Sequence, residues 1–132
     1  MEDQRNNLCF ACSPSNPIGF HLEFKFKDNI CRAFFTAGEN HQGWNGLMHG
    51  GLISTLLDEA MGQLLWRQKK IAVTAEINIR FSLPVPIGEK LLVEAWETDS
   101  NRRLYKLSAA ITLSDGKQAV TAEGKFLPVK LQ

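Results

Sequence analysis

Only one stretch of this chain has the periodicity of a long helix, and this limits the folds that the chain can form. Apolar residues recur there at the three- and four-residue spacing of one helix face. They are Ile53, Leu57, Ala60 and Leu64, flanked by Leu56 and Met61, within residues 47–70. A helix with such a face must bury it, and one helix can cover one face of one sheet.

The rest of the chain has the two-residue period of β-strands. Two strands are predicted before the helix, at residues 21–28 and 30–36, and four after it, at 72–81, 90–97, 103–113 and 118–127. The short turns between them favour antiparallel neighbours. The sequence therefore predicts an α+β domain built from two strands, one helix and four further strands.

Length and charge narrow the class of protein. A chain of 132 residues fits a single domain, 1–132, of which 1–18 would form an N-terminal arm. The net charge of +1 gives no reason to expect a nucleic-acid or membrane partner. The chain shows neither a signal peptide nor an apolar run of spanning length, so we expect a cytoplasmic protein with reduced thiols.

A C-x-x-C pair, Cys9 and Cys12, opens the predicted arm. A structural zinc site needs four ligands, and no second pair follows at the spacing of a zinc finger. A thioredoxin-like pair would begin a helix, whereas Pro14 and Pro17 follow here. The sequence therefore predicts packing residues at these positions, and neither a metal nor a cofactor.

The start of the helix carries the pattern His49-Gly50-Gly51. Glycine inside a helix costs about 1 kcal/mol relative to alanine, so bare backbone has a purpose here. Free N–H groups at a helix N-terminus bind oxygen atoms of ligands, which is one explanation. A tight entry from loop to helix is the other.

One flank of the helix carries small residues around a single carboxylate. At 100° per residue, Asp58 shares this flank with Gly51, Ser54, Gly62 and Leu65. A ligand could run along this flank to Asp58. Most aspartates, however, are solvated surface acids, and Glu59 fits that description better. In the strand that follows, alternation places Thr74 on the face opposite Ile77. By itself, Thr74 is simply a good strand residue.

HQGWNGLMHGGLISTLLDEAMG, followed by VTAEINIRFSLPVPIGE, resembles the hotdog-fold acyl-CoA thioesterases of the phenylacetic-acid-pathway type. The opening CFACSPSNPIGFHLEF is similar to the arm of one branch of them. The resemblance implies a long central helix wrapped by a curved antiparallel sheet of about five or six strands. It also implies active sites at the interface of a homodimer, which could assemble further into a tetramer.

By the same resemblance, Asp58 matches the catalytic carboxylate, and Gly50 matches the glycine whose N–H polarises the thioester carbonyl. His49 would order the loop or orient the reacting groups, and Gln42 would supply an amide. Thr74 would come from the neighbouring subunit and position the water. Gly51, Ser54 and Asn45 are added as substrate-binding candidates.

These roles predict hydrolysis of a small, medium-chain or aromatic acyl-CoA. Asp58 would act as a general base on water, or would attack the carbonyl directly. The alternatives are a non-catalytic acyl-CoA-binding module and a hotdog hydratase or dehydratase. Apolar residues near the helix ends would line the acyl pocket; they are Trp44, Leu47, Met48, Leu65 and Trp66.

Overall fold

A computed structural model describes residues 8–130 of the chain, so positions 1–7 of the predicted arm lie outside the described residues. The elements are β1 (Lys25–Lys27), β2 (Ile30–Thr36), the short 3₁₀ helix η1 (Glu39–His41), α1 (Gly50–Arg67), β3 (Ala72–Phe81), β4 (Lys90–Ser100), β5 (Tyr105–Thr112) and β6 (Gln118–Pro128). The predicted order of two strands, one helix and four strands is confirmed.

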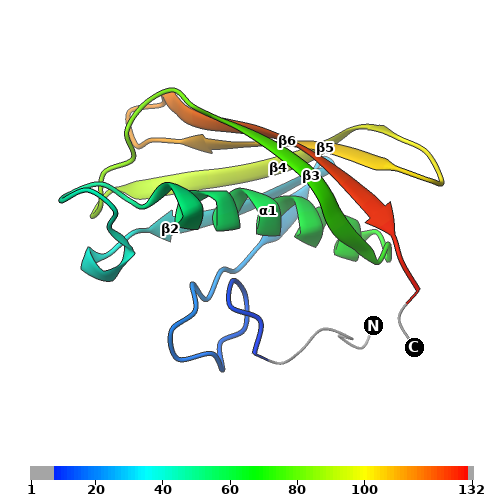
Figure 1. The fold of residues 1–132 in the computed structure, drawn as a ribbon, viewed down its shortest axis with the longest axis horizontal. Coiled ribbons are helices and arrows are strands. Elements are labelled where there is room, and N and C mark those ends of the chain that lie inside the picture. The colour runs from blue at the N-terminus through cyan, green and yellow to red at the C-terminus, as the bar shows by residue number, and fades with distance from the viewer. Residues whose placement is uncertain (1–7, 131–132) are drawn as a thin grey trace.

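The six strands of residues 8–130 form one antiparallel sheet in the order β1-β2-β4-β5-β6-β3. Figure 1 shows this sheet curving over α1, which lies along one of its faces. The strand that follows the helix directly, β3, lies at one edge of the sheet and pairs with β6 alone. The helix and the strand after it therefore stand side by side.

The apolar face of α1 forms the centre of the core. All six residues of the predicted stripe and its flanks are buried, and Leu56, Leu57 and Met61 have no exposed surface. Burying a side chain of this size stabilises the fold by about 1.5–3 kcal/mol. They pack against buried residues of the sheet such as Leu91 and Val93, which confirms the predicted packing of one helix on one sheet.

The helix is shorter than its periodicity suggested, because both ends are taken up by other structure. The expected range was 47–70, whereas α1 ends at Arg67. Before the helix, Met48 forms an isolated β-bridge with Gln42 of the same loop, and Leu47 forms one with Pro86 of the loop after β3. After it, Lys69 adopts a left-handed backbone conformation with a φ of 62°, which stops the helix.

A β-bulge interrupts the pairing of β3 with β6 near the start of β3. Thr74 pairs with Phe126 and Glu76 pairs with Lys125, so Ala75 is the extra residue. An extra residue changes the face to which the preceding side chains point. The expectation that Thr74 lies opposite Ile77 is therefore wrong, and Thr74 faces the helix.

The predicted arm folds back on itself over residues 8–22. The backbone N–H groups of Phe20 and Leu22 donate to the carbonyl oxygens of Phe10 and Ala11, each at 2.9 Å. A side-chain carbon at Gly19 would collide with the Phe10 carbonyl oxygen, which explains the glycine there. Because these residues pair with the arm, β1 is shorter than the strand predicted before the turn.

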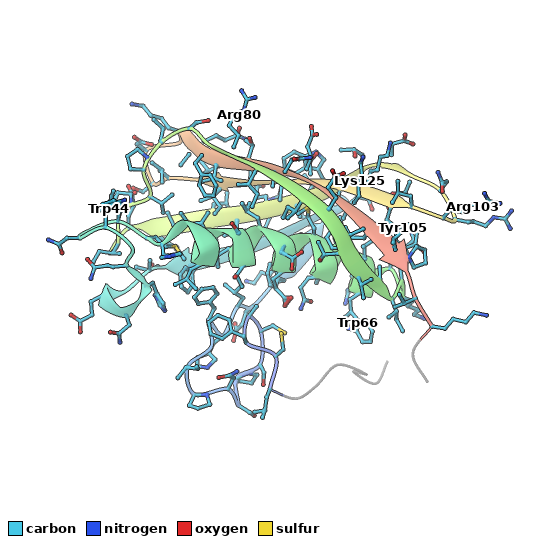
Figure 2. The ribbon with its side chains drawn as sticks, in the orientation of Figure 1. Trp44, Trp66, Arg80, Arg103, Tyr105 and Lys125 are labelled. Carbon is cyan, nitrogen blue, oxygen red and sulfur yellow. The ribbon has the colours of Figure 1, made fainter. Side chains whose placement is uncertain are left out.

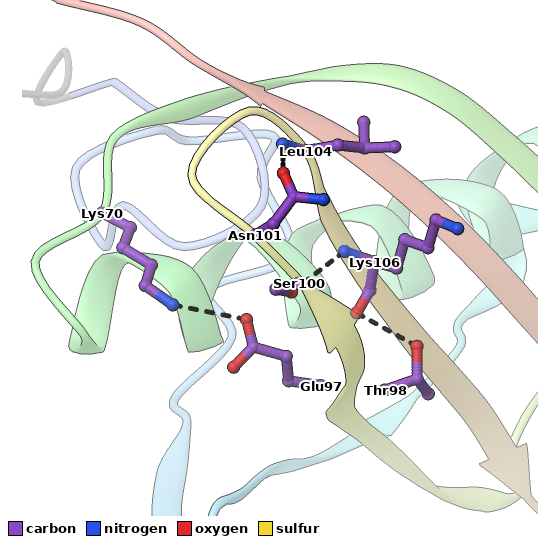
Figure 3. A network of polar contacts seen from close by, with 7 residues as sticks. All are labelled: Lys70, Glu97, Thr98, Ser100, Asn101, Leu104 and Lys106. Carbon is purple, nitrogen blue, oxygen red and sulfur yellow. Dashed lines mark hydrogen bonds and ion pairs between the residues drawn. The ribbon is translucent and has the colours of Figure 1, made fainter.

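Polar contacts close the β4–β5 hairpin and tie it to the end of α1 (Figure 3). Lys70, just beyond the helix, pairs with Glu97 at 3.3 Å. Burial opposes ionisation of the Glu97 carboxyl, but the Ser100 hydroxyl and the Lys70 ammonium together keep its pKa below the ordinary value. The Thr98 hydroxyl donates to the Lys106 carbonyl oxygen at 3.1 Å. The hairpin is thus fixed relative to the helix.

A methyl group at Gly124 would destabilise the fold, because this glycine is a point of close approach. Its Cβ would lie 2.8 Å from both the Met61 sulfur and the Phe126 ring. We expect Gly124→Ala to lower the free energy of unfolding by about 1–3 kcal/mol in urea denaturation.

The helix offers a matched control for that substitution. No atom lies within 4 Å of the Cβ position of Gly62, so Gly62→Ala should raise the free energy of unfolding by about 0.5–1 kcal/mol. Equal effects of the two substitutions would contradict the packing described for Gly124.

Candidate active site

Asp58 and Thr74 come together between the helix and the edge strand. The Thr74 hydroxyl donates a hydrogen bond to Asp58 Oδ1, with 2.6 Å between the two oxygens. This is a short hydrogen bond between a hydroxyl and a carboxyl oxygen. Within residues 8–130 no hydrogen bond reaches the second oxygen, Oδ2. The pair therefore combines a fixed carboxylate with an oxygen that can accept a proton.

A groove of about 330 Å³ lies beside this pair. Its walls come from α1, β3 and β6 and are Asp58, Glu59, Gly62, Trp66, Ile71, Ala72, Val73, Thr74 and Phe126. Most of the lining is apolar, and the carboxylate–hydroxyl pair supplies polar groups. Such a groove suits a ligand with an apolar chain and one reactive polar group.

A larger groove of about 550 Å³ lies on the outer face of the sheet. Its walls include Asn78, Arg80 and Glu123, and none of the predicted site residues lines it. Figure 2 shows Arg80 on that outer side, away from α1. The groove beside Asp58 is therefore the one that the predicted chemistry can use.

The structure corrects the expected source of Thr74. The resemblance implied that the neighbouring subunit supplies this hydroxyl, but Thr74 of the same chain reaches Asp58. The bulge at Ala75 turns the side chain toward the helix, and β3 follows α1 closely enough for contact. The pair is complete within one chain.

His49 caps the N-terminus of α1. Its Nδ1 accepts the backbone N–H of Gly51 at 2.9 Å, so the proton of the neutral ring lies on Nε2. A Cβ at position 51 would lie 3.2 Å from two atoms of this ring. Gly51 thus makes room for the cap, and its N–H is engaged by His49 instead of being open to a substrate.

Gly50 differs from Gly51 in both respects. A Cβ at Gly50 would make only an ordinary contact, 3.7 Å, with the ring of Phe81. Its N–H has no acceptor within residues 8–130. As the first residue of α1, Gly50 presents this donor at the positive end of the helix dipole. Of the two glycines, Gly50 has the N–H that can bind a carbonyl oxygen.

The other candidates hold the backbone around this donor. The Gln42 amide donates to the Glu39 carbonyl oxygen at 2.7 Å and accepts the Gly46 N–H at 2.6 Å, so it braces the loop. The Ser54 hydroxyl donates to the Gly50 carbonyl oxygen at 2.8 Å. Asn45 is exposed in the loop and is not among the residues that line the groove at Asp58.

Of the five apolar residues expected to line the acyl pocket, only Trp66 lines the groove at Asp58, and Leu47 is half-buried in the loop before α1. Met48 and Leu65 are buried in the core. Trp44 is 84% exposed, and Figure 2 shows it near the beginning of α1, at the opposite end from Trp66. The sequence missed Phe126, because its place opposite Thr74 depends on the strand register.

The donor and the carboxylate stand apart within one chain. Gly50 and Asp58 are eight residues apart in α1, and a rise of 1.5 Å per residue separates them by about 12 Å. A general base and an oxyanion donor must both reach one carbonyl group, which requires contacts of about 3 Å. Gly50 and Asp58 of the same chain therefore lie too far apart to contact one carbonyl group together.

Removal of the Thr74 hydroxyl tests the pair directly. We expect Thr74→Val to lower kcat by about 10–100-fold, the effect of losing one hydrogen bond to a charged group. Thr74→Ser keeps the hydroxyl and should keep most of the activity. Steady-state rates of thioester cleavage, the activity that the sequence resemblance implies, measure both, and equal losses in the two variants would contradict a role for the hydroxyl.

Comparison with known proteins places this chain in a family. The model of the thioesterase superfamily matches residues 45–120, which is more than half of the chain. Acyl-coenzyme A thioesterase THEM4 of Bos taurus is 30% identical over 115 residues, which cover 83% of this chain and 46% of that protein. Acyl-coenzyme A thioesterase THEM5 of Mus musculus is 28% identical, with 80% of this chain and 42% of that protein covered. The chain spans less than half the length of these relatives.

Solved structures agree on the fold. The crystal structure of a thioesterase superfamily protein matches with a TM-score of 0.84 and 26% identity, over 89% of this chain and 58% of that chain. The PaaI protein of the E. coli phenylacetic acid degradation operon gives a TM-score of 0.78 at 18% identity, over 84% of this chain and 81% of that chain. A Streptococcus mutans protein bound to acetyl CoA also gives a TM-score of 0.78 at 18% identity, over 84% of this chain and 90% of that chain.

These likenesses confirm the hotdog fold that the resemblance implied. No helix in residues 8–130 has the length and apolar character needed to cross a membrane. From the family model and the sequence relatives together, the chain belongs to the thioesterase superfamily.

Proposed function

We propose that this chain hydrolyses the thioester bond of an acyl-CoA to a free acid and CoA. The contact between Thr74 and Asp58 beside an apolar groove carries this proposal, since it places a carboxylate where an acyl group can lie. The names of the relatives support it, because both are acyl-coenzyme A thioesterases.

The chemistry needs a base and an oxyanion donor. Asp58 takes a proton from water that the Thr74 hydroxyl helps to hold, and the hydroxide attacks the thioester carbon. The oxygen of the carbonyl becomes negative and accepts the N–H of Gly50, which can contribute about 3 kcal/mol to the transition state. The carbon–sulfur bond then breaks, and CoA leaves as a thiolate, which is a better leaving group than an alkoxide because a thiol is the stronger acid.

A homodimer would bring the two halves of the site together. Gly50 lies against Phe81 at the end of β3, whereas Asp58 bonds to Thr74 near its start. Two β3 strands paired antiparallel about a twofold axis would place the end of one beside the start of the other. Asp58 of one subunit would then face the partner subunit's Gly50.

The edge of the sheet supports this assembly. β3 is ten residues long and has no neighbour on its outer side within residues 8–130. Its side chains Val73 and Phe81 are each about half exposed, at 51% and 52%. A long edge strand with exposed apolar side chains can pair with a strand of a second chain. We propose the homodimer as the working unit.

The groove limits the acyl group. Its volume of about 330 Å³ is at the lower end of the range for small-molecule sites. Trp66 and Phe126 supply aromatic surface, and Val73 supplies aliphatic surface. This lining favours small, medium-chain or aromatic acyl groups over long chains.

Release of free thiol from a panel of acyl-CoAs tests the proposal. Hydrolysis should liberate one thiol per acid formed, with the highest kcat/KM among the acyl groups that the groove can hold. A hydratase would consume enoyl-CoA without releasing thiol, and a binding module would retain acyl-CoA unchanged. Either result would overturn the proposed activity.

A further inference from the structure

The C-x-x-C pair of the arm lies against a glutamate of α1. Cys9, Cys12 and Glu59 each offer one ligand atom, and these atoms all lie within 4.8 Å of one another. Two come from the arm and one from the helix, some fifty residues later in the chain. The sequence alone offered two ligands, and the fold adds a third.

The arm holds its two cysteines in a fixed turn. The Ser13 N–H donates to the Cys9 carbonyl oxygen at 3.0 Å, which closes the turn around both cysteines. The bonds from Phe20 and Leu22 to the two residues between the cysteines secure the turn from the other side. The thiols are therefore positioned by the backbone before any ligand arrives.

The glutamate is also positioned. The Gln63 side-chain amide, one helical turn further on, donates to Glu59 Oε2 at 3.2 Å. Gln63 is 7% exposed, so its amide is a buried polar group. Hydrogen bonds of this kind orient the ligands of metal sites. Glu59 is thus half-buried and oriented, contrary to the expectation of a solvated surface acid.

The spacing between the ligand atoms of Cys9 and Glu59 matches a tetrahedral site. Zinc binds thiolate sulfur at about 2.3 Å and carboxylate oxygen at about 2.0–2.2 Å, so neighbouring ligands stand about 3.6–3.8 Å apart. The Cys9 sulfur and Glu59 Oε2 are 3.7 Å apart. Three protein ligands are one fewer than in a closed structural zinc site, so water or a small anion would have to be the fourth ligand, and the partial exposure of all three residues allows this.

We propose that Cys9, Cys12 and Glu59 bind a zinc ion that joins the N-terminal arm to α1. Binding replaces both thiol protons, so two protons leave for each ion bound. Glu59 also lines the groove at Asp58. The ion therefore fixes the arm against a wall of that groove, at a site separate from the Asp58–Thr74 pair.

The third cysteine provides a matched control. Cys31 is fully buried and lies outside the cluster. Burial, reinforced by the charge of Glu59, raises the pKa of its thiol to about 12, so it stays protonated at neutral pH. Cys31→Ala should therefore leave metal binding unchanged.

Metal titration of the full chain tests the site. Protein kept reduced and stripped with a chelator is titrated with Zn²⁺, and with Co²⁺ as a spectroscopic probe of thiolate ligands. We expect one ion per chain, two protons released, and a thiolate-to-cobalt charge-transfer band. Cys9→Ser and Cys12→Ser should abolish the band, and Glu59→Gln should weaken affinity at least about tenfold. Circular dichroism checks that each variant folds.

Two results would overturn the proposal. One is a Cys9–Cys12 disulfide in the protein as isolated, with no zinc bound after reduction. The other is metal affinity that Glu59→Gln leaves unchanged in a folded variant, because binding would then rest on the cysteines alone. Neither readout depends on thioester hydrolysis, so the metal site and the proposed activity can fail separately.

Discussion

Replacing Asp58 with asparagine is expected to lower kcat for acyl-CoA hydrolysis by about 10²–10⁴-fold, the range that follows loss of a general base. Asparagine has nearly the shape of aspartate and keeps an oxygen that can accept the hydrogen bond of the Thr74 hydroxyl, which is 2.6 Å from Asp58 Oδ1 in the unsubstituted chain. The fold should therefore persist while the proton acceptor is lost. Initial rates of thiol release measure the effect.

Glu76→Gln is the matched control for that loss of charge. Glu76 lies on β3, two residues from Thr74, and pairs with Lys125 at 3.1 Å. Its kcat should equal that of the unsubstituted protein. A similar loss in both variants, or full activity in Asp58→Asn, would contradict the assignment of Asp58.

The same residue can be tested as a nucleophile. Direct attack by Asp58 would form a mixed anhydride, which water can open at the aspartate carbon. A single turnover in isotope-labelled water should place the label in the product acid alone. Label in Asp58 would reject the general-base mechanism while keeping the residue catalytic.

Gly50→Pro should lower kcat by about 10²–10³-fold, because it removes the proposed oxyanion donor. Proline is well suited to the first position of a helix, where its missing N–H breaks no helical bond. The preceding residue, His49, has the extended conformation that proline requires, with φ −62° and ψ 132°. The helix should therefore form in this variant.

Gly50→Ala separates the donor from the side chain. Alanine keeps the N–H, and its Cβ would lie 3.7 Å from the Phe81 ring, which is ordinary contact. We expect this variant to keep most of the activity. Equal losses with alanine and proline would show that space at position 50 matters, and not the N–H.

Mixing inactive chains tests where the subunits divide the site. A heterodimer of Gly50→Pro and Asp58→Asn chains has one intact site if Gly50 and Asp58 act across the interface. Random exchange should then restore about a quarter of the activity. A mixture of Thr74→Val and Asp58→Asn chains should show no more activity than the separate variants, because Thr74 and Asp58 act from the same chain and no heterodimer then has an intact site. No recovery in the first mixture would overturn the shared site.

The fold was predictable because its main features are periodic. The helix stripe centred on Leu57 and the alternation in the strands determine which faces are buried, and both were found in the sequence. Strand order was not predictable by this route, since it depends on contacts between distant segments. The shortened first strand shows the same limit, because its expected residues bond to the arm.

The candidate site was predicted in part for a similar reason. Asp58 stood out because small residues flank it on the helix, and Gly50 stood out because glycine is costly there. The direction of Thr74 was predicted wrongly, since Thr74-Ala75-Glu76 looks like ordinary alternation and hides the bulge. The approach of Glu59 to Cys9 spans fifty residues, so no local pattern signals it.

Because of the bulge in β3, the side of the sheet on which the Thr74 hydroxyl lies depends on how many residues the strand contains at this point, and not on which residues they are. Ala75 carries only a methyl group, yet the extra position it fills inverts the orientation of the strand residues before it. An alanine can therefore be as necessary to this site as an aspartate. Among related chains, length in this segment should be constrained more tightly than side-chain chemistry.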